Sequence, residues 1–278
     1  ILIENIKMYS SVDDDPILKC KMALIDLNVP RLFFRDIHAD RIEASGVELF
    51  SPPQRTLSGI REKVLSNTHL SLEHKNDLWV IKKAIAQLGP LKIKALGAIR
   101  TYSPKTEKEN KSFSYYLGQF IQISPELLKA QEHVSSFSNP TLTIETKPWG
   151  IHSFNADFDF TADSYQKPTL LKISAIHFQG TGNFHLPLKG NLRMLGSVGL
   201  IQKDGTEIRG LKMAGQWKSL PNKENPWPDH LKWSTTEISS HKTTICSLYG
   251  NLISTQQSKI FSHLSFLFGN QPIGATAS

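Results

Sequence analysis

The alternation of apolar and polar residues through most of the chain is the feature that most constrains its fold. Runs such as Phe154, Ala156, Phe158 and Phe160 repeat with a period of two. Successive side chains of a β-strand point to opposite faces, so this period is what a strand with one buried and one wet face requires. The word Gly-Asn-Phe/Leu recurs at 182–184, 190–192 and 250–252. Because Gly-Asn tolerates positive φ, we expect these words to turn or kink the chain between strands.

The sequence therefore predicts a mainly β fold: curved antiparallel sheets built from short meander strands, with two or three capping helices. At 278 residues the chain is long enough to bury a sizeable core. We expect a β-meander with inserted helices over 1–136 and a β-rich domain, continuous with it, over 137–257. A C-terminal helix and tail are expected over 258–278.

Three segments carry helical signals. Leu78, Ile81, Ile85 and Leu88 recur at helical spacing between Asn76-Asp77 and Gly89-Pro90, which predicts a helix over 76–88. Ser124-Pro125 predicts the start of a second helix, because Ser suits the N-cap and Pro the first helical position. The third signal is an amphipathic segment that ends at Gly269, and we expect it to dock a protein partner through Ile260, Phe261, Leu264 and Phe268.

Composition narrows the function classes. Hydrophobic residues make up 39% of the chain and charged residues 21%, which fits neither a membrane-embedded nor a wholly disordered protein. The formal net charge is +7. The basic residues are scattered and do not alternate with aromatic residues on one face, so nucleic acid is not an expected partner. Attraction to an acidic membrane surface remains open, beside a merely solvated basic surface.

Cysteine usage gives no metal or redox motif. Cys20 and Cys246 stand far apart in apolar, strand-like contexts, and no Cys-x-x-Cys occurs. We expect two buried free thiols, with a single disulfide between the terminal regions as the alternative.

Candidate catalytic and metal-binding residues are few. His177 and His185 lie on neighbouring strand-like segments that adjacent strands could bring together, but no third ligand follows by spacing. Asp157, Asp159 and Asp163 are expected to share one strand face, which suits the solvated side of a strand, acid/base work or calcium binding. No nucleophile elbow or phosphate-binding loop is present, so no catalytic residue, metal or cofactor is predicted.

An apolar stripe is the strongest candidate for a binding site. Aromatic residues recur at inward-type positions of the β-rich region, and two readings use the same side chains: a packed sandwich core, or an open groove for acyl chains. The groove reading assigns ligand binding to Phe154, Phe158, Phe160, Phe184, Leu186, Leu188, Leu192 and Met194.

Some stretches resemble a known family. Ile1-Leu-Ile-Glu-Asn-Ile-Lys-Met8, Asp36-Ile-His-Ala-Asp-Arg-Ile-Glu-Ala-Ser-Gly-Val-Glu-Leu49 and Leu186-Pro-Leu-Lys-Gly-Asn-Leu-Arg-Met194 are similar to the strand words of AsmA-like bacterial envelope proteins. The resemblance covers residues 1–100 and 170–253. It implies a bent antiparallel sheet with an apolar interior, no catalytic residues, and a part in phospholipid traffic. It also implies a periplasmic or inner-membrane-anchored location, with the anchor absent from this chain.

Three functions follow as hypotheses. The leading one is a non-enzymatic envelope domain whose apolar β-groove binds lipid acyl chains for phospholipid transport. The second is a structural or adaptor β-domain of a larger envelope assembly, with a closed core and no ligand. The third is a hydrolase that uses Asp157 or Asp159.

Overall fold

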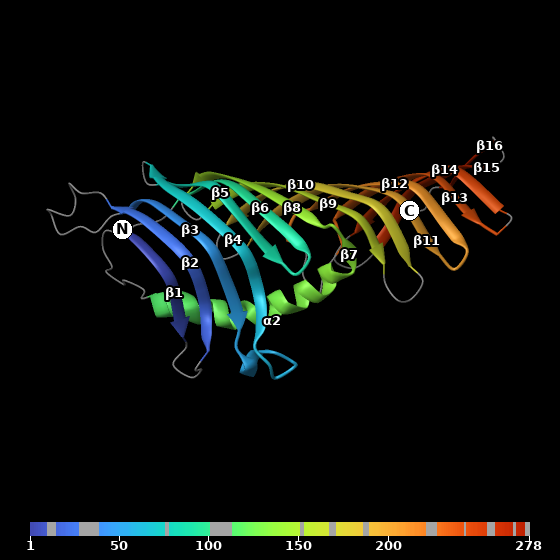
Figure 1. The fold of residues 1–278 in the computed structure, drawn as a ribbon. Helices are drawn as coiled ribbons and strands as arrows, with labels where there is room; N and C mark the ends of the chain where they lie inside the picture. The colour runs from blue at the N-terminus through green and yellow to red at the C-terminus, as the bar shows by residue number, and fades with distance from the viewer. Residues whose placement is uncertain are drawn as a thin grey trace. The chain divides into compact units, whose positions relative to one another are not determined.

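A computed structural model describes residues 1–9, 15–27, 39–75, 78–100, 113–150, 153–166, 171–185, 189–220, 227–241, 243–254, 259–268 and 271–275. The fold is mainly β and antiparallel, as the alternation predicted (Figure 1). The chain divides into two compact units. Unit 1 comprises Ile1–Ser135 and Thr143–His152, and unit 2 comprises Ser136–Leu142 and Ser153–Ser278.

Unit 1 is a meander in which consecutive strands pair with one another. Its strands follow the order β1-β2-β3-β4-β5-β6-β8. Their bounds are β1 (Leu2–Tyr9), β2 (Pro16–Leu27), β3 (Ala39–Ser51), β4 (Glu62–Lys75), β5 (Leu78–Leu88), β6 (Leu91–Arg100) and β8 (Thr141–Gly150). A 3-10 turn, η1 (Pro53–Arg55), follows β3.

Unit 2 is a second meander, and its long strands keep an unbroken register from β9 to β14. The two-residue strand β7 (Phe137–Ser138) pairs with β9. The order is β9 (Ser153–Gln166), β10 (Lys172–His185), β11 (Lys189–Lys203), β12 (Thr206–Trp217), β13 (His230–Ser240), β14 (Thr243–Ser254), β15 (Lys259–Phe268) and β16 (Gln271–Ala275). Strands of up to 15 residues are longer than the short ones expected.

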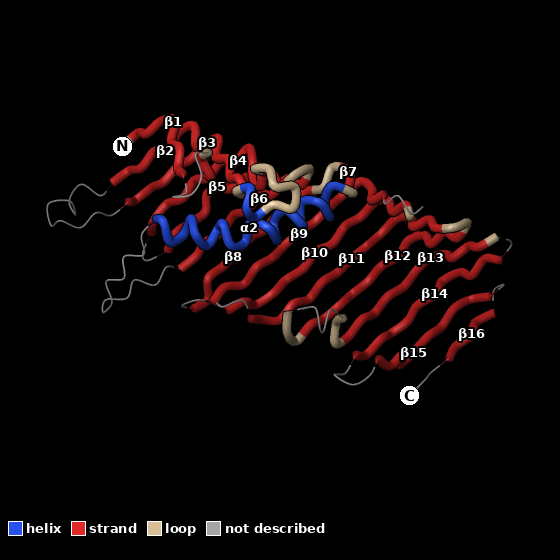
Figure 2. Tube along the Cα trace, turned by 90° about the horizontal axis from the view of Figure 1, so that it is seen from below, coloured by secondary structure: helices blue, strands red, loops and turns tan. Residues whose placement is uncertain are grey.

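The only α-helix among the described residues is α2 (Phe113–Ser135), which lies across one face of unit 1 and contacts β3, β4 and β6 (Figure 2). The predicted start at Ser124 is wrong, because the helix begins eleven residues earlier and Pro125 lies inside it. Pro125 has no N–H to give to the carbonyl of Ile121. The Ser124 hydroxyl donates to that oxygen instead, at 2.9 Å, so the helix continues through the proline.

The other two predicted helices are wrong. Residues 78–88 form strand β5, and residues 259–268 form strand β15. In both cases the pairing shifts register, between Ile81 and Ala84 in β5 and at two places in the ladder of β14 with β15. A bulge adds a residue to one strand and moves the apolar positions out of period two. A bulged strand can therefore imitate helical spacing.

A row of unusual backbone conformations crosses unit 2. Ala175 in β10, Gly210 in β12 and Ser247 in β14 all have positive φ, between 52° and 61°. The register places these residues in one line across the sheet, with Gly199 of β11 and Thr236 of β13 between them. Asn5 and Gly46 form the same pattern in β1 and β3 of unit 1, on either side of Lys21. We call the line through Ala175, Gly210 and Ser247 the crease; left-handed residues bend a strand.

The recurring Gly-Asn words do not turn the chain. They lie inside β10, β11 and β14, and their glycines are absent from the positive-φ residues. Instead, Asn183 pairs with Asn191 across β10 and β11, and Asn155 of β9 continues the row. The word places glycine and the apolar residue on one face and asparagine on the other.

Candidate functional site

Six of the eight residues predicted to bind acyl chains share one face of unit 2. Register pairs join Phe154 to Phe184, Phe158 to Gly180 and Gly182 to Leu192, with Met194 opposite Gly180 on the next strand. Phe160 lies on the same face of β9. Leu186 and Leu188 fall outside the described residues. The same register adds Phe178, Val198, Met213, Trp217, Leu231, Trp233 and Leu252. We call this the ring face, and its reverse side the polar face.

The aromatic rings of this face lie down on glycines. A β-carbon added at Gly180 would overlap the ring of Phe158, and one at Gly250 would come within 2.7 Å of Trp233. Gly196 lies in the same way under Phe178, with its added β-carbon 2.5 Å from the ring. Gly182 and Gly215 are covered by the rings of Phe184 and Trp217, each two residues further along its own strand. The rings therefore cover the backbone rather than standing upright from it.

Neighbouring rings also contact one another. Phe154 and Phe184 stack with 5.4 Å between centroids, and Phe160 and Phe178 stack at 6.4 Å. Phe137 of β7 meets Phe160 edge to face at 5.5 Å. These separations lie within the range in which aromatic pairs stabilise one another. The result is a continuous apolar floor that runs across the strands.

The ring face is the more buried side of the unit 2 sheet. The six buried apolar side chains of strands β9 to β14, namely Ala156, Ala162, Ile176, Val198, Trp217 and Leu252, all lie on it. Adjacent residues show the contrast, since Leu252 is 6% exposed and Ile253 is 37% exposed. Apolar side chains on the ring face therefore cover one another more than those on the polar face do.

No second layer covers this face among the described residues. The described strands of unit 2 lie side by side in a single sheet (Figure 2). Most of the ring-face side chains are accordingly half-buried rather than buried, including Phe154, Phe158, Phe160, Phe184 and Met194. The closed sandwich core, which was the alternative reading of the stripe, is not what the described strands form.

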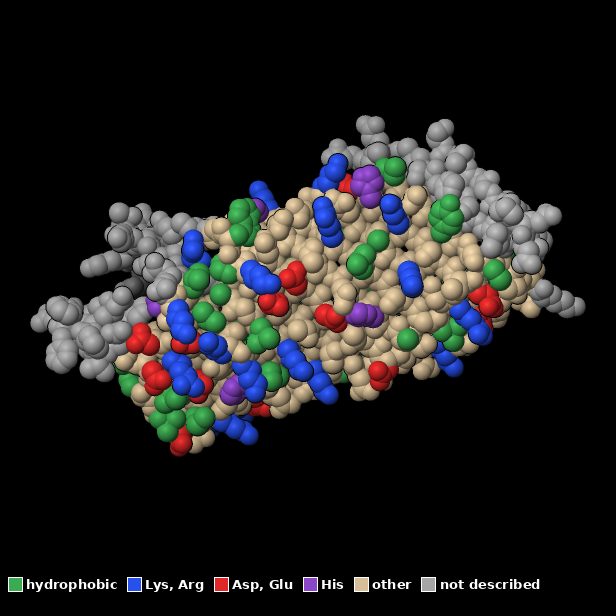
Figure 3. Space-filling model, turned by 90° about the horizontal axis from the view of Figure 1, so that it is seen from above, with side chains coloured by type: hydrophobic (Ala, Val, Ile, Leu, Met, Phe, Trp, Pro, Cys, Tyr) green, Lys and Arg blue, Asp and Glu red, His purple; other side chains and the backbone are tan. Residues whose placement is uncertain are grey.

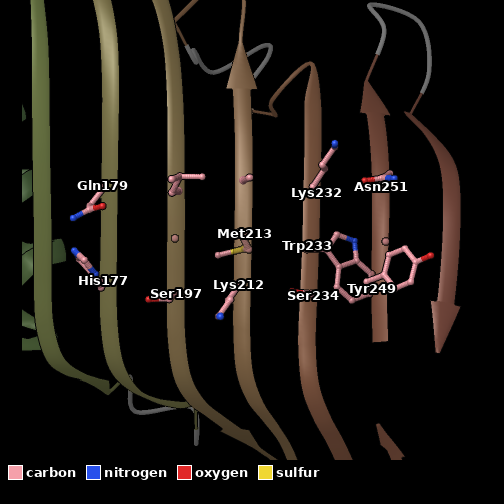
Figure 4. Close-up of a pocket in the computed structure, with 14 residues that line it drawn as sticks. His177, Gln179, Ser197, Lys212, Met213, Lys232, Trp233, Ser234, Tyr249 and Asn251 are labelled. Atoms are coloured by element: carbon pink, nitrogen blue, oxygen red, sulfur yellow. The ribbon is translucent and has the colours of Figure 1, made fainter. Parts of the chain in front are cut away.

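The polar face carries charged and hydrogen-bonding side chains over an exposed backbone (Figure 3). A shallow hollow of about 620 Å³ lies over β10 to β14, and ten of its fourteen lining residues have their side chains on this face. Lys212 and Lys232 point away from each other in it, and His177 and Gln179 are directed toward β9 (Figure 4). The side chains therefore do not converge on a common point.

Asp159 is a carboxylate of the polar face with two side-chain hydrogen bonds. It accepts hydrogen bonds from the Gln179 amide at 2.9 Å and from the His177 ring at 3.1 Å. These bonds, the Gln179 bond first, lower the pKa of the Asp159 carboxyl below its usual value. Asp157 lies on the same face, as predicted. A carboxylate held in its ionised form by neighbours is an ordinary feature of a wet sheet surface.

The two histidines considered as metal ligands are not brought together. His177 and His185 lie on one strand, β10, rather than on neighbouring strands. Eight residues of extended chain separate them by about 26 Å. His185 is bonded to Ser153 at 2.7 Å, while His177 faces Asp159. Within the described ranges, no three His, Cys, Asp or Glu side chains form a group that could hold a metal ion.

Both cysteines are free thiols, so the disulfide alternative is wrong. Cys20 is buried, as predicted. Cys246 is exposed, which corrects the expectation of two buried thiols.

The glycines under the rings are the residues of the ring face that sequence reasoning missed. The signal lay in the sequence as glycine two residues from an aromatic residue, in Gly182-Asn-Phe184 and Gly215-Gln-Trp217. Cross-strand partners such as Gly180 and Gly250 could be found only once the register was known, because they depend on which residues face one another.

No helix among the described residues is long and apolar enough to cross a membrane. Comparisons of this chain with protein-family models, with curated proteins and with solved structures gave no match.

Proposed function

We propose that this protein is a non-enzymatic lipid-binding protein whose ring face in unit 2 holds lipid acyl chains. The observation that carries the proposal is the single-layered ring face, where rings lie flat on glycines and no described element covers them. Soluble proteins rarely leave a contiguous apolar surface open to water unless it binds something. A hydrocarbon tail on this floor would remove the exposed ring surfaces from water.

The dimensions of the ring face suit an acyl chain. It extends over six strands, β9 to β14, which at about 4.8 Å per strand gives a length of about 24 Å. The hydrocarbon core of one bilayer leaflet is about 15 Å thick, half of the usual bilayer core. The ring face is therefore long enough for one tail lying across the strands. Two cross-strand register rows contain Phe158 and Trp233. No polar side chain lies on the ring face in either row.

A place in the bacterial envelope and a role in phospholipid transport belong to the same proposal. They are supported by the resemblance of the strand words to AsmA-like proteins. The non-enzymatic part of the proposal is supported by the sequence, which contains no nucleophile elbow or phosphate-binding loop.

The test uses two adjacent residues on opposite faces of β11. Met194 is half-buried on the ring face, whereas Leu195 is 61% exposed on the polar face. The full chain and its Met194→Glu and Leu195→Glu variants are stripped of lipid and titrated with a fluorescent fatty acid. Native mass spectrometry of the unstripped proteins records any lipid that copurifies.

We expect the wild type and Leu195→Glu to bind and Met194→Glu to bind at least tenfold more weakly, because a carboxylate on the ring face must be desolvated by the tail. Equal loss in both variants, or no lipid bound by the wild type, would refute the proposal. The second result would favour the structural or adaptor role.

A further inference from the structure

The connection between β3 and β4 in unit 1 presents two apolar side chains to solvent. Leu57 is 96% exposed and Ile60 is 68% exposed, the highest values among the large hydrophobic residues of the described chain. They lie on the segment 52–61, which projects from the ends of the two strands (Figure 1). We call this segment the β3–β4 loop. Exposing a leucine side chain almost completely to water costs free energy. Most loops avoid this cost by placing polar residues at the tip.

The loop holds these side chains outward through its own hydrogen bonds. The Thr56 hydroxyl contacts the carbonyl of Ile60 at 2.7 Å and that of Pro53 at 3.0 Å, and the Gly59 amide donates to the Thr56 carbonyl. Gly59 has a φ of 66°, which closes the turn, and no atom lies near its missing side chain. The tip is thus an ordered turn with Leu57 at its corner, rather than a strand end left unpaired.

Cationic side chains surround the base of the loop. Residues 52–61 include Arg55 and Arg61, and the next residue, Glu62, accepts a hydrogen bond from the Ser58 hydroxyl. The Arg61 guanidinium lies over the Phe50 ring, 3.6 Å from its centroid, and donates to the Pro16 carbonyl. Lys19 and Lys63 flank the same ring, and Lys63 is paired with Glu48. Among the described residues Arg55 has no acidic partner. An apolar tip above a basic collar is the arrangement that fits a bilayer with anionic headgroups.

We propose that the β3–β4 loop docks this protein on an anionic phospholipid membrane, with Leu57 and Ile60 entering the boundary between headgroups and acyl chains. Arg55 and Arg61 then lie at the depth of the lipid phosphates. The two apolar side chains lose their contact with water, and the basic collar neutralises part of the surface charge. This surface lies in unit 1 and is separate from the acyl-chain site proposed for unit 2, so either proposal can fail while the other holds.

The test measures cosedimentation of the full chain with vesicles of phosphatidylcholine containing phosphatidylglycerol. Leu57→Asp and Ile60→Asp remove the apolar tip, and Leu96→Asp is the matched control, since Leu96 is an exposed leucine on strand β6 of the same unit. We expect each tip variant to bind about tenfold more weakly. Leu96→Asp should bind as the wild type does. Arg55→Gln should bind about fivefold more weakly, with the difference lost in high salt.

Several outcomes would overturn the inference. They are unchanged vesicle binding by Leu57→Asp, equal loss by Leu96→Asp, and no binding of the wild type to these vesicles, which would leave the tip to a protein partner. Titration with detergent-dispersed fatty acid separates this surface from the ring face. The tip variants should take up fatty acid normally, whereas Met194→Glu should lose fatty acid while keeping its vesicle binding.

Discussion

The ring of Phe158 lies flat on Gly180, its register partner on the neighbouring strand, in the space that any β-carbon at position 180 would need. The relationship recurs along the face, with Phe178 on Gly196 and Trp233 on Gly250. An aromatic ring on a cross-strand glycine shields backbone that glycine leaves bare, and it supplies the packing that glycine lacks. It also keeps each ring close to the backbone of the sheet.

This relationship predicts that the effect of Gly180→Ala on stability changes sign when the Phe158 ring is removed. Gly180→Ala should lower the free energy of unfolding by about 1–3 kcal/mol, because the new methyl group pushes the Phe158 ring out of its place. In a Phe158→Ala background the same change should be neutral or should raise stability by about 0.5–1 kcal/mol, since alanine suits a strand better than glycine does. Urea unfolding of the four proteins measures both values. Equal effects in the two backgrounds would show that the ring does not occupy this space.

The crease predicts that one alanine is better replaced by glycine. Ala175 has a φ of 52°, a conformation in which an L-residue is strained by about 1–2 kcal/mol. Ala175→Gly relieves the strain in the folded state but raises the conformational entropy of the unfolded chain, which opposes folding. We expect a net gain of about 0.5–1 kcal/mol in the free energy of unfolding.

The matched control is Ala156→Gly, a buried alanine on β9 whose backbone is not left-handed. That change removes a buried methyl group and should cost about 1–2 kcal/mol. Thermal or urea unfolding should therefore move in opposite directions for the two substitutions. A loss of stability in both would mean that position 175 is not strained.

The buried serine pair that joins strand β3 to helix α2 predicts a large loss of stability from a small change. Ser51 and Ser124 are fully buried with their hydroxyl oxygens 2.9 Å apart, and Ser124 donates to Ile121, so Ser51 donates to Ser124. Ser124→Ala leaves a carbonyl and a hydroxyl without partners and should cost about 1–3 kcal/mol. Ser135 makes the same bond to the carbonyl three residues earlier, but at an exposed helix end. Ser135→Ala should change stability by less than about 0.5 kcal/mol in the same urea titration.

The hydrogen bonds to Asp159 predict a weak acid sensitivity. A carboxyl whose pKa is lowered by folding stabilises the native state above its unfolded pKa of about 3.9, and this contribution is lost as the pH falls through the folded pKa. Asp159→Asn should therefore be less stable than wild type at pH 6 and equal to it at low pH.

Because the Asp159 side chain is 42% exposed, the gap at pH 6 should be about 0.5 kcal/mol at most. Gln179→Leu removes the first of the two donors and should reduce the gap. Urea midpoints measured from pH 6 downward test this. A gap that widened as the pH fell would contradict the assignment.

The sequence was a good guide to the fold class, because a period of two is a direct product of strand geometry. It failed where a bulge intervened. In β5 the register shift between Ile81 and Ala84 places Leu78, Ile81, Ile85 and Leu88 at spacings of three and four, which a helix also gives. The shift between Asn251 and Leu252 in the ladder of β14 with β15 adds a residue to β15 and had the same effect on residues 259–268. Alternation does not reveal a bulge until the partner strand is known.

The membership of the ring face within one strand was predictable for the same reason that strands were, since parity alone puts Phe154, Phe158 and Phe160 on one side. Its openness was not. Whether a second layer covers an apolar face depends on how strands are connected in space, and a meander and a sandwich share the same alternation. The glycine beneath each cross-strand ring likewise depends on register. The predicted start of helix α2 was wrong because the Ser124 hydroxyl donates to the Ile121 carbonyl, which Pro125 cannot do, and the helix therefore continues through the proline.

Contacts between neighbouring strands hold unit 2 together, because each described strand from β9 to β16 is hydrogen-bonded to the strands beside it in one sheet. A fold of this kind behaves as a one-dimensional array, in which every added hairpin contributes an increment of cohesion and no central nucleus binds the whole. Melting would then begin at an edge and travel inward strand by strand, so that hydrogen exchange would record a gradient across the sheet in place of a single cooperative threshold.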